Sequence, residues 1–326
     1  VKSLRPLPEK WHGLSNVETR YRQRYLDLLV NPQVKEVFHR RTRIMSLIRS
    51  FLQERGFVEV ETPMMQTIPG GATARPFKTH HNTYKLDLYL RISPELYLKR
   101  LLVGGFERVF EINRNFRNEG ISTQHNPEFT MLEFYQAYAT YEDLIELTEE
   151  MICSLCEQMQ GSLSLPYLDR EIDFTPPWDR LTMKESIIRY GKLEPPVLED
   201  RELALAALRN LDLEPSSQQG IGYLINELFE TLVQPHLIKP TFITSYPTEV
   251  SPLARRNDNN PDETDRFELF INGQEIANAF SELIDPLDQR ARFEQQCAAP
   301  REPDEEEPQL DEDFIQALEY GMPPAA

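Results

Sequence analysis

The fold of this chain is decided by Phe116-Arg117-Asn118-Glu119 and by His125-Asn126-Pro127-Glu128-Phe129-Thr130-Met131-Leu132-Glu133-Phe134-Tyr135, which follows a short loop. Before the loop, residues 109–116 alternate apolar and polar side chains, as in a half-buried strand. After the loop, every second residue from Phe129 to Tyr135 falls on one strand face. Residues 120–124 contain the glycine and small polar side chains that are typical of a turn. The pattern predicts a hairpin with a mobile loop.

The side chains of this hairpin bring several kinds of chemistry to one region. A guanidinium binds phosphate or carboxylate, an aromatic ring stacks on a flat ring, and carboxylates bind amines. The combination suits an anionic ligand that carries a flat ring. An ordinary core hairpin with a salt-bridged rim would show the same local pattern, so the hairpin alone leaves both interpretations open.

Composition limits the classes of protein that the chain can belong to. With 326 residues and 40% hydrophobic content, the chain can bury a substantial core in one large domain or two modest ones. Its net charge of −18 argues against indiscriminate binding of nucleic acids or membranes through bulk attraction. No apolar run approaches the length of a membrane span, and the first residues lack the apolar core of a signal peptide. We therefore expect a cytoplasmic location.

The three cysteines, an odd number, argue against a disulfide framework. Cys153 and Cys156 form a Cys-x-x-Cys pattern inside an amphipathic helical repeat that has no second ligand pair nearby. We expect them to pack in a helix rather than to bind a metal or act in redox chemistry.

The first third of the chain predicts a helix, a strand and a ligand loop. Residues 33–55 form an amphipathic helix, Gly56 ends it at the C′ position, and residues 57–63 alternate as a strand that a proline stops. Residues 69–77 are rich in glycine, which allows a ligand to approach the backbone but also simply forms turns. Residues 86–92 form a strand.

The next helix is predicted to begin with Ser93 at the N-cap, Pro94 at N1 and Glu95 in the first turn. Glu95 would complement the helix dipole in a purely structural role. Further helices are expected over residues 141–159, 202–211, 221–233 and 313–320, and a strand over 241–246.

A second hairpin is predicted around Asn272-Gly273, which is the strongest short-range hairpin signal. In a two-residue hairpin Phe270 pairs with Glu275, so Glu268 lies diagonal to Glu275 on the same face, roughly 7–8 Å away between Cα atoms. Two carboxylates this close can share Mg²⁺, which usually takes one or two protein carboxylates and leaves its other positions to phosphate oxygens and water. The alternative, two exposed edge charges, is weakened by the apolar residues around both.

The quoted hairpin resembles the second signature motif of class II aminoacyl-tRNA synthetases, in the form found in lysyl-tRNA synthetases. The helix, Gly56, the strand and Glu61-Thr62-Pro63 look like the first motif, which builds the dimer interface in that family. The resemblance spans nearly the whole chain. It implies an α+β fold, with an antiparallel sheet flanked by helices and a helical insertion, and a homodimer. It also implies lysine, ATP and tRNA(Lys) as partners and Mg²⁺ as cofactor.

The resemblance also implies roles for individual residues. Arg117 would be catalytic and hold the lysine carboxylate and the α-phosphate. The ATP-binding residues would be Arg117, Glu119, His125, Phe129, Glu268 and Glu275, with Phe129 stacked on adenine and the metal on Glu268 and Glu275. The lysine-binding residues would be Gly71, Glu95, Glu133, Tyr135, Asn278, Phe280 and Glu282.

These assignments conflict with a regular ladder in the second hairpin. Strict alternation places Asn278, Phe280 and Glu282 on the face opposite Glu275. We therefore predict a β-bulge near Ile276-Ala277 that resets the alternation.

The resemblance divides the chain into four parts. Residues 1–32 would be the linker that follows an anticodon-binding barrel, 33–160 the first part of the catalytic domain, 161–240 the helical insertion and 241–326 the second part. The barrel and the third signature motif are expected to lie outside this sequence, and we expect weakened aminoacylation for that reason. The acidic segment 300–307 is expected to be mobile.

Two alternatives stay open. Paralogues of the family attach a lysine-type group to a translation factor, although residues 251–257 and 120–124 look more like the tRNA ligases. The chain could also be a catalytically impaired dimerising fragment.

Overall fold

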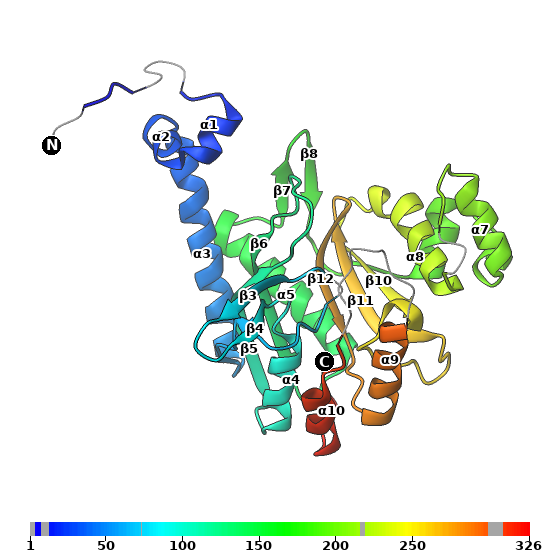
Figure 1. The fold of residues 1–326 in the computed structure, drawn as a ribbon. Helices are drawn as coiled ribbons and strands as arrows, with labels where there is room; N and C mark the ends of the chain where they lie inside the picture. The colour runs from blue at the N-terminus through cyan, green and yellow to red at the C-terminus, as the bar shows by residue number, and fades with distance from the viewer. Residues whose placement is uncertain (1–3, 8–12, 73, 216–218, 299–308) are drawn as a thin grey trace.

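A computed structural model describes residues 4–7, 13–72, 74–215, 219–298 and 309–326, and the segment 300–307 lies outside them. The chain forms mixed and antiparallel sheets flanked by helices (Figure 1), so the predicted α+β fold is confirmed. Among the described residues, no helix combines the length and the apolar composition that a bilayer-spanning segment needs.

The first sheet contains the hairpin from which the fold was predicted. Strands β5 (Arg108–Phe116) and β6 (Glu128–Gln136) pair antiparallel without interruption, from Arg108 opposite Gln136 to Phe116 opposite Glu128. The short strand β1 (Val58–Glu59) adds to β5 in parallel. Because the register is unbroken, the side chains alternate regularly and the two ends of the loop are held together.

The second sheet has the order β12-β11-β10-β9, with β9 (Asp179–Thr182), β10 (Thr241–Pro247), β11 (Glu263–Ile271) and β12 (Gln274–Phe280). Phe270 pairs with Glu275 but Leu269 pairs with Ala277, so Ile276 is an extra residue in β12. The predicted bulge is confirmed. It places Glu275 and Asn278 on the same face as Glu268, which is opposite Asn278 in the ladder.

The segment 324–326 lies between the two sheets. Gln136 N–H donates to the carbonyl of Ala326 at 2.8 Å, and Glu282 N–H donates to the carbonyl of Ala325 at 2.8 Å. These bonds connect the end of β6 to the residues that follow β12.

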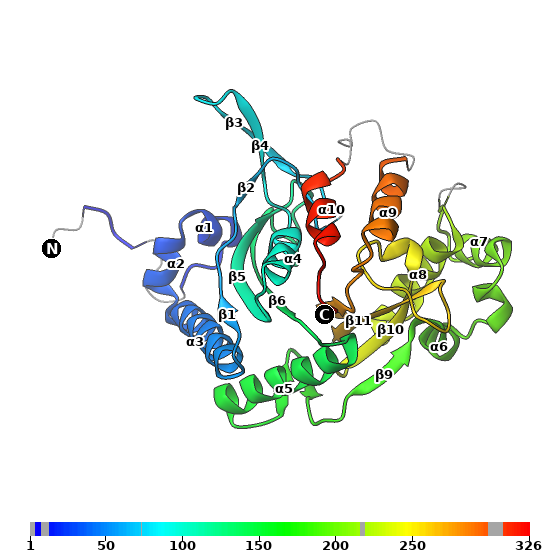
Figure 2. The ribbon, with the colours of Figure 1, turned by 90° about the horizontal axis from the view of Figure 1, so that it is seen from below.

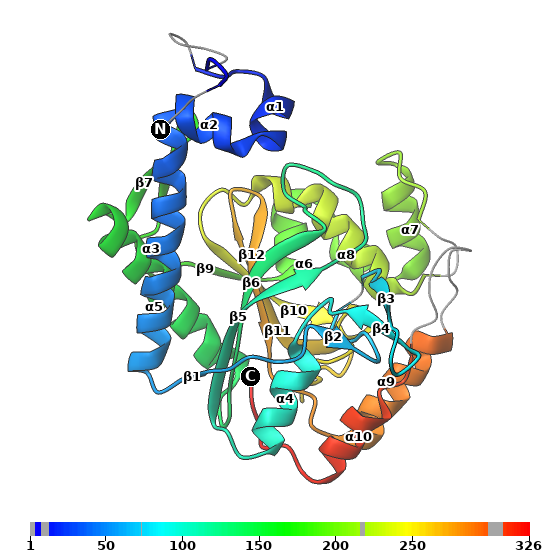
Figure 3. The ribbon, with the colours of Figure 1, turned by 60° about the vertical axis from the view of Figure 1, so that its left-hand side comes forward.

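Helices cover the first sheet and its edges. Helix α3 (Pro32–Glu54) packs beside α5 (Tyr141–Gln160), and the two short helices α1 (Val17–Arg22) and α2 (Arg24–Val30) lie at one end of α3 (Figure 3). Gly56, with φ +81°, follows the C-cap of α3 as predicted. Both cysteines of the Cys-x-x-Cys pattern lie in α5. Cys156 is buried in the core, and the Cys153 thiol donates to the Phe174 carbonyl.

Helix α4 (Glu95–Val103) begins one residue later than predicted, with Pro94 rather than Ser93 at the N-cap. The Ser93 hydroxyl still accepts a hydrogen bond from Glu95 N–H at 3.1 Å. Helices α9 (Pro286–Ala298) and α10 (Glu312–Glu319) lie side by side near α4 (Figure 2). Helix α9 was not predicted from the sequence.

The range 161–240 is not helical throughout. It begins with the hairpin β7 (Ser164–Tyr167) and β8 (Arg170–Asp173) and with β9, which pairs with β10. The helical part follows, with α6 (Met183–Ser186), α7 (Arg201–Arg209) and α8 (Ile221–Leu232), on the side away from α3 (Figure 1). The division of the chain into four parts stays a prediction.

A third small sheet carries β4 (Leu86–Leu90) between β2 (Met65–Gln66) and β3 (Phe77–His81), and its β3–β4 end projects from the body (Figure 2). Arg91, directly after β4, is only 2% exposed. Its guanidinium lies 2.8 Å from Glu111 and donates to the carbonyls of Arg114 and Thr62. This buried ion pair fixes β4 and the segment after β1 onto β5.

We predict that Arg91→Met lowers the free energy of unfolding by about 3–5 kcal/mol, because it leaves the Glu111 carboxylate buried without its cation. Urea unfolding followed by circular dichroism measures the change. Arg22→Met, which removes an exposed pair with Glu18, serves as control and should cost at most about 0.5 kcal/mol. Equal losses in the two variants would contradict the prediction.

Candidate active site

Arg117 lies where the two hairpins face each other. It follows the last residue of β5, and its backbone N–H donates to the Pro127 carbonyl at 2.8 Å. Its guanidinium carbon lies 5.1 Å from the centre of the Phe129 ring, and its positive charge acts on Glu275 of the second hairpin. Within the described part of the chain, the buried Nε of Arg117 has no hydrogen-bond partner. A buried donor without a partner is costly, so Arg117 is suited to receive an anionic ligand.

The loop that joins β5 and β6 carries Glu119 and His125, both exposed. The His125 ring lies with Nδ1 3.0 Å from the Ser122 hydroxyl, which also accepts from His125 N–H. Glu119 accepts from Arg75 N–H at 3.4 Å, and Asn118 N–H donates to the Arg75 carbonyl. The loop therefore touches the glycine-rich segment, and both side chains remain open to a ligand.

Glu268 and Glu275 form the acidic pair predicted from the second hairpin. They line a cavity of about 210 Å³ together with residues of α8 and with Arg266. Glu268 accepts from Tyr246 Oη at 2.8 Å and pairs with Arg266 at 2.6 Å. Burial first, and then the charge of Glu268, raises the pKa of Glu275 to about 7. The two carboxylates thus repel each other, although Arg266 and Arg117 offset part of the repulsion.

The donor set of this acidic pair fits Mg²⁺. Carboxylate oxygens are its preferred protein ligands. A metal cation beside Arg266 and Arg117 would relieve the repulsion between the two carboxylates that raises the pKa of Glu275. Each carboxylate oxygen can accept more than one interaction, so the contacts of Glu268 with Arg266 and Tyr246 do not exhaust it. No group of three or more His, Cys, Asp and Glu side chains that could hold a metal occurs among the described residues. A metal here would take its remaining ligands from phosphate or water.

The structure gathers most of the predicted lysine-binding residues into one cluster, which we call the lysine pocket after its predicted role. Tyr135 Oη donates to Glu133 at 2.9 Å, and the Ser93 hydroxyl donates to the same carboxylate at 3.3 Å. Glu95 and Glu282 are each less than 8% exposed. These residues come from α4 and the segment just before it, from β6 and from the segment after β12, which are far apart in sequence.

Gly71 closes one wall of this pocket. Its φ is +82°, and a Cβ at this position would lie 2.8 Å from Cβ of Glu95 and 3.1 Å from Oγ of Ser93. Only glycine allows so close an approach of the backbone in this conformation.

A residue that was not predicted also lies in the pocket. The Lys99 ammonium is 2.5 Å from Glu95 and 2.6 Å from Glu282, and it lies 5.1 Å from the centre of the Phe280 ring. The spacing of Glu95 and Lys99, one helical turn apart, was a signal for their pairing. Asn278 lies elsewhere in the site, because its Oδ1 accepts from Arg266 Nε at 3.1 Å.

The pocket is strongly acidic for a buried site. Burial first, and then the neighbouring Glu95, raises the pKa of Glu133 to about 8. Burial likewise raises the pKa of Glu282 to about 8, although the charge of Lys99 acts in the opposite direction. The ion pairs raise the pKa of Lys99 despite its burial, so Lys99 stays protonated. The pocket is suited to a cationic group.

Comparison with known proteins agrees with this geometry. The family described as "tRNA synthetases class II (D, K and N)" matches residues 16–326. The chain belongs to this family of class II tRNA synthetases.

Several curated relatives of this chain carry the name lysine–tRNA ligase. The one from Pelotomaculum thermopropionicum is 60% identical over 328 residues, which is 99% of this chain and 64% of the relative. Those from Syntrophomonas wolfei and Moorella thermoacetica are 59% and 60% identical over 99% of this chain and 66% of each relative. The chain thus spans about two thirds of the length of the relatives that it matches.

The raised pKa of Glu133 predicts a pH-dependent stability. Between pH 4.5 and about 8 the folded state keeps a proton that the unfolded chain releases, so this carboxyl lowers stability as the pH rises through that window. In the ligand-free protein, Glu133→Gln should therefore stabilise the fold at pH 8.5, by an amount on the order of 1–3 kcal/mol, and have little effect at pH 5. Thermal or urea unfolding at both pH values measures this.

The exposed Glu119 provides the matched control, since Glu119→Gln should show no such difference between the two pH values. An effect of Glu133→Gln that is the same at pH 5 and pH 8.5 would contradict the prediction.

Proposed function

We propose that this chain activates lysine with ATP to form lysyl-adenylate and transfers the lysyl group to the 3′ end of tRNA(Lys). The observation that carries the proposal is the cluster formed by the buried Glu95 and Glu282 and the half-buried Glu133, close to the motif that presents Arg117. A neutral or shorter amino acid would leave one of these carboxylates without a cation. Because an unpaired buried carboxylate is costly, such an amino acid would bind more weakly than lysine. The names of the relatives support lysine as the substrate.

The chemistry of the first step fits the side chains at this site. A carboxylate is already a nucleophile, so the attack of lysine on the α-phosphate requires no general base. Arg117 would bind the lysine carboxylate and the α-phosphate together and favour in-line attack through positioning and charge stabilisation. Phe129 would stack on the adenine, and Glu119 and His125 would contact the nucleotide from the loop.

Glu268 and Glu275 would hold Mg²⁺, which neutralises the charge of the leaving pyrophosphate when bound. Phe280, Gly71 and Tyr135 would complete the lysine site, and Asn278 would lie beside it on the same strand as Phe280. The proposal keeps the cytoplasmic location expected from the sequence, where a tRNA ligase acts in protein biosynthesis.

Lysine-dependent ATP–pyrophosphate exchange tests the activation step. The chain should catalyse exchange, and Arg117→Ala should reduce kcat/KM by about 10²- to 10³-fold because it removes the charge at the α-phosphate. Arg114→Ala, three residues earlier on β5 and exposed in its pair with Glu128, is the matched control and should stay within about twofold of wild type. Exchange that is absent from the wild-type chain, or undiminished in Arg117→Ala, would contradict the proposal.

The acceptor is tested by offering labelled lysine and ATP with either tRNA or candidate translation factors. Label on tRNA supports the proposed ligase. Label on a protein would support the alternative in which the adenylate reacts with a translation factor.

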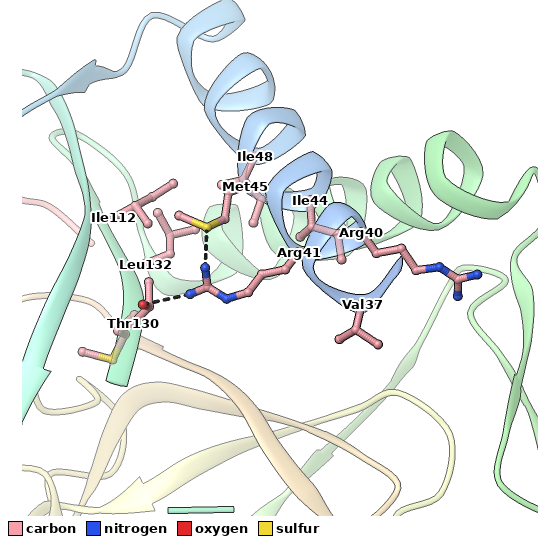
Figure 4. A pocket seen from close by; sticks show the side chains of 10 residues that line it. Val37, Arg40, Arg41, Ile44, Met45, Ile48, Ile112, Thr130 and Leu132 are labelled. Atoms are coloured by element: carbon pink, nitrogen blue, oxygen red, sulfur yellow. Dashed lines mark hydrogen bonds between the residues drawn. The ribbon is translucent and has the colours of Figure 1, made fainter. Parts of the chain in front are cut away.

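A homodimer forms part of the proposal. The exposed side of α3 and the strands beside it enclose an apolar hollow of about 420 Å³ (Figure 4). Val37 and Ile44 lie at this surface with 65% and 37% of their area exposed, and the exposed Arg41 reaches toward the strands and donates to Thr130 at 2.9 Å. Such a patch, on the helix that resembles the first class II motif, suits a second copy of the chain.

We predict that the chain sediments as a dimer at micromolar concentrations and that Ile44→Glu converts it to a monomer, because a charge would be buried in the interface. Lys35→Glu, an exposed change on the same helix, should leave the dimer intact. Analytical ultracentrifugation separates these outcomes. A wild-type monomer would contradict the dimer proposal.

A further inference from the structure

Lys99 is the most deeply buried cation next to the proposed lysine pocket. It lies on α4, one turn after Glu95, and is 1% exposed. Its ammonium contacts Glu95 at 2.5 Å and Glu282 at 2.6 Å, and faces the Phe280 ring at 5.1 Å. Lys99 thus touches three of the residues that the proposed function assigns to lysine binding.

Exposed pairs one helical turn apart are common and weak, but this pair is neither exposed nor isolated. Glu95 is on the same helix as Lys99, whereas Glu282 comes from the segment after β12. Lys99 therefore fixes the positions of two carboxylates relative to each other. Without it, both would be buried side by side without a cation.

The charges of the pocket can be counted from the groups that face Lys99. Glu95 approaches from α4, Glu133 and Tyr135 belong to β6, and Glu282 follows β12. When all three carboxylates are ionised and Lys99 is protonated, two negative charges remain. Two ammonium groups neutralise this charge, and a diamino acid such as lysine carries two.

We propose that Lys99 is a positioning and specificity-determining residue, which holds Glu95 and Glu282 in place as carboxylates and sets the pocket charge to match an amino acid with two ammonium groups. The inference rests on the proposed function for the identity of the pocket. An amino acid with a single ammonium group leaves one buried negative charge uncompensated, which weakens its binding. Lys99 itself takes no part in the chemical step.

Loss of Lys99 should act through protonation. The charge of Lys99 opposes the effect of burial on the pKa of Glu282, so without Lys99 the Glu282 carboxyl would keep its proton to a higher pH. A protonated carboxyl no longer attracts the substrate ammonium. The defect should therefore be larger at low pH and smaller at high pH, which a purely structural role would not produce.

The test compares lysine binding by calorimetry and lysine KM in the exchange reaction for wild type, Lys99→Met and Lys99→Arg, between pH 6.5 and 8.5. Lys99→Met should weaken lysine binding by at least about tenfold at pH 6.5 and less at pH 8.5, with ATP binding within about twofold of wild type. It should also lower the preference for lysine over norleucine, which lacks the second ammonium. Lys99→Arg should restore part of the lysine affinity and the pH dependence of wild type.

The control is Lys184→Met, which removes another ion-paired lysine, 2.9 Å from Glu263 and outside the pocket. It should bind lysine as wild type does. If Lys99→Met does not fold, Lys99→Arg carries the test through its lysine and ATP affinities.

Equal losses of lysine and ATP binding with an unchanged pH profile would overturn the inference, and so would a failure of both Lys99 variants to fold, since either result assigns Lys99 a structural role. A wild-type chain that binds no lysine would overturn the proposed function itself, whatever the variants do.

Discussion

The extra residue Ile276 in β12 is the constraint on which the arrangement of the site depends. Side chains alternate strictly along a regular strand, so Glu275 and Asn278 would otherwise point to opposite faces. The bulge moves the later residues by one position and brings Glu275 to the face of Glu268 and Asn278. One inserted residue therefore allows a single strand to serve both the acidic pair and the amino-acid pocket.

A second constraint is the charge that this face must hold. Buried carboxylates are stable only when cations or donors accompany them. Several acidic groups of the site have such partners: Arg266 and Tyr246 for Glu268, Tyr135 and Ser93 for Glu133, and Lys99 for Glu95 and Glu282. The compensation is incomplete, as the raised pKa values of Glu133 and Glu275 indicate. The protein gives up stability at the place where a cationic ligand and a metal would restore it.

Local sequence patterns predicted the elements that follow simple rules. The alternation of apolar and polar residues predicted both hairpins, and Asn272-Gly273 predicted the turn of the second. The bulge was predicted from the conflict between strict alternation and the expected lysine pocket. Helix α9 was missed because it buries Gln289 and Arg292, which donate to backbone carbonyls, instead of an apolar stripe. Lys99 was missed because its pairing with Glu95 has the spacing of an ordinary surface pair. Its burial next to Glu282 depends on segments that are distant in sequence.

Those distant segments also explain why the pocket forms only in the complete fold. Glu95 is held by α4, Glu133 by β6 and Glu282 by the residues after β12. The backbone of Ala325 and Ala326 bonds to Glu282 and to Gln136, so it ties the last two of these segments together. A buried ion pair tolerates little error in distance, because its attraction must offset the desolvation of both charges. The backbone bonds on both sides of residues 324–326 keep Glu282 within reach of Lys99. The ion pair at the site therefore depends on the contact between the two sheets.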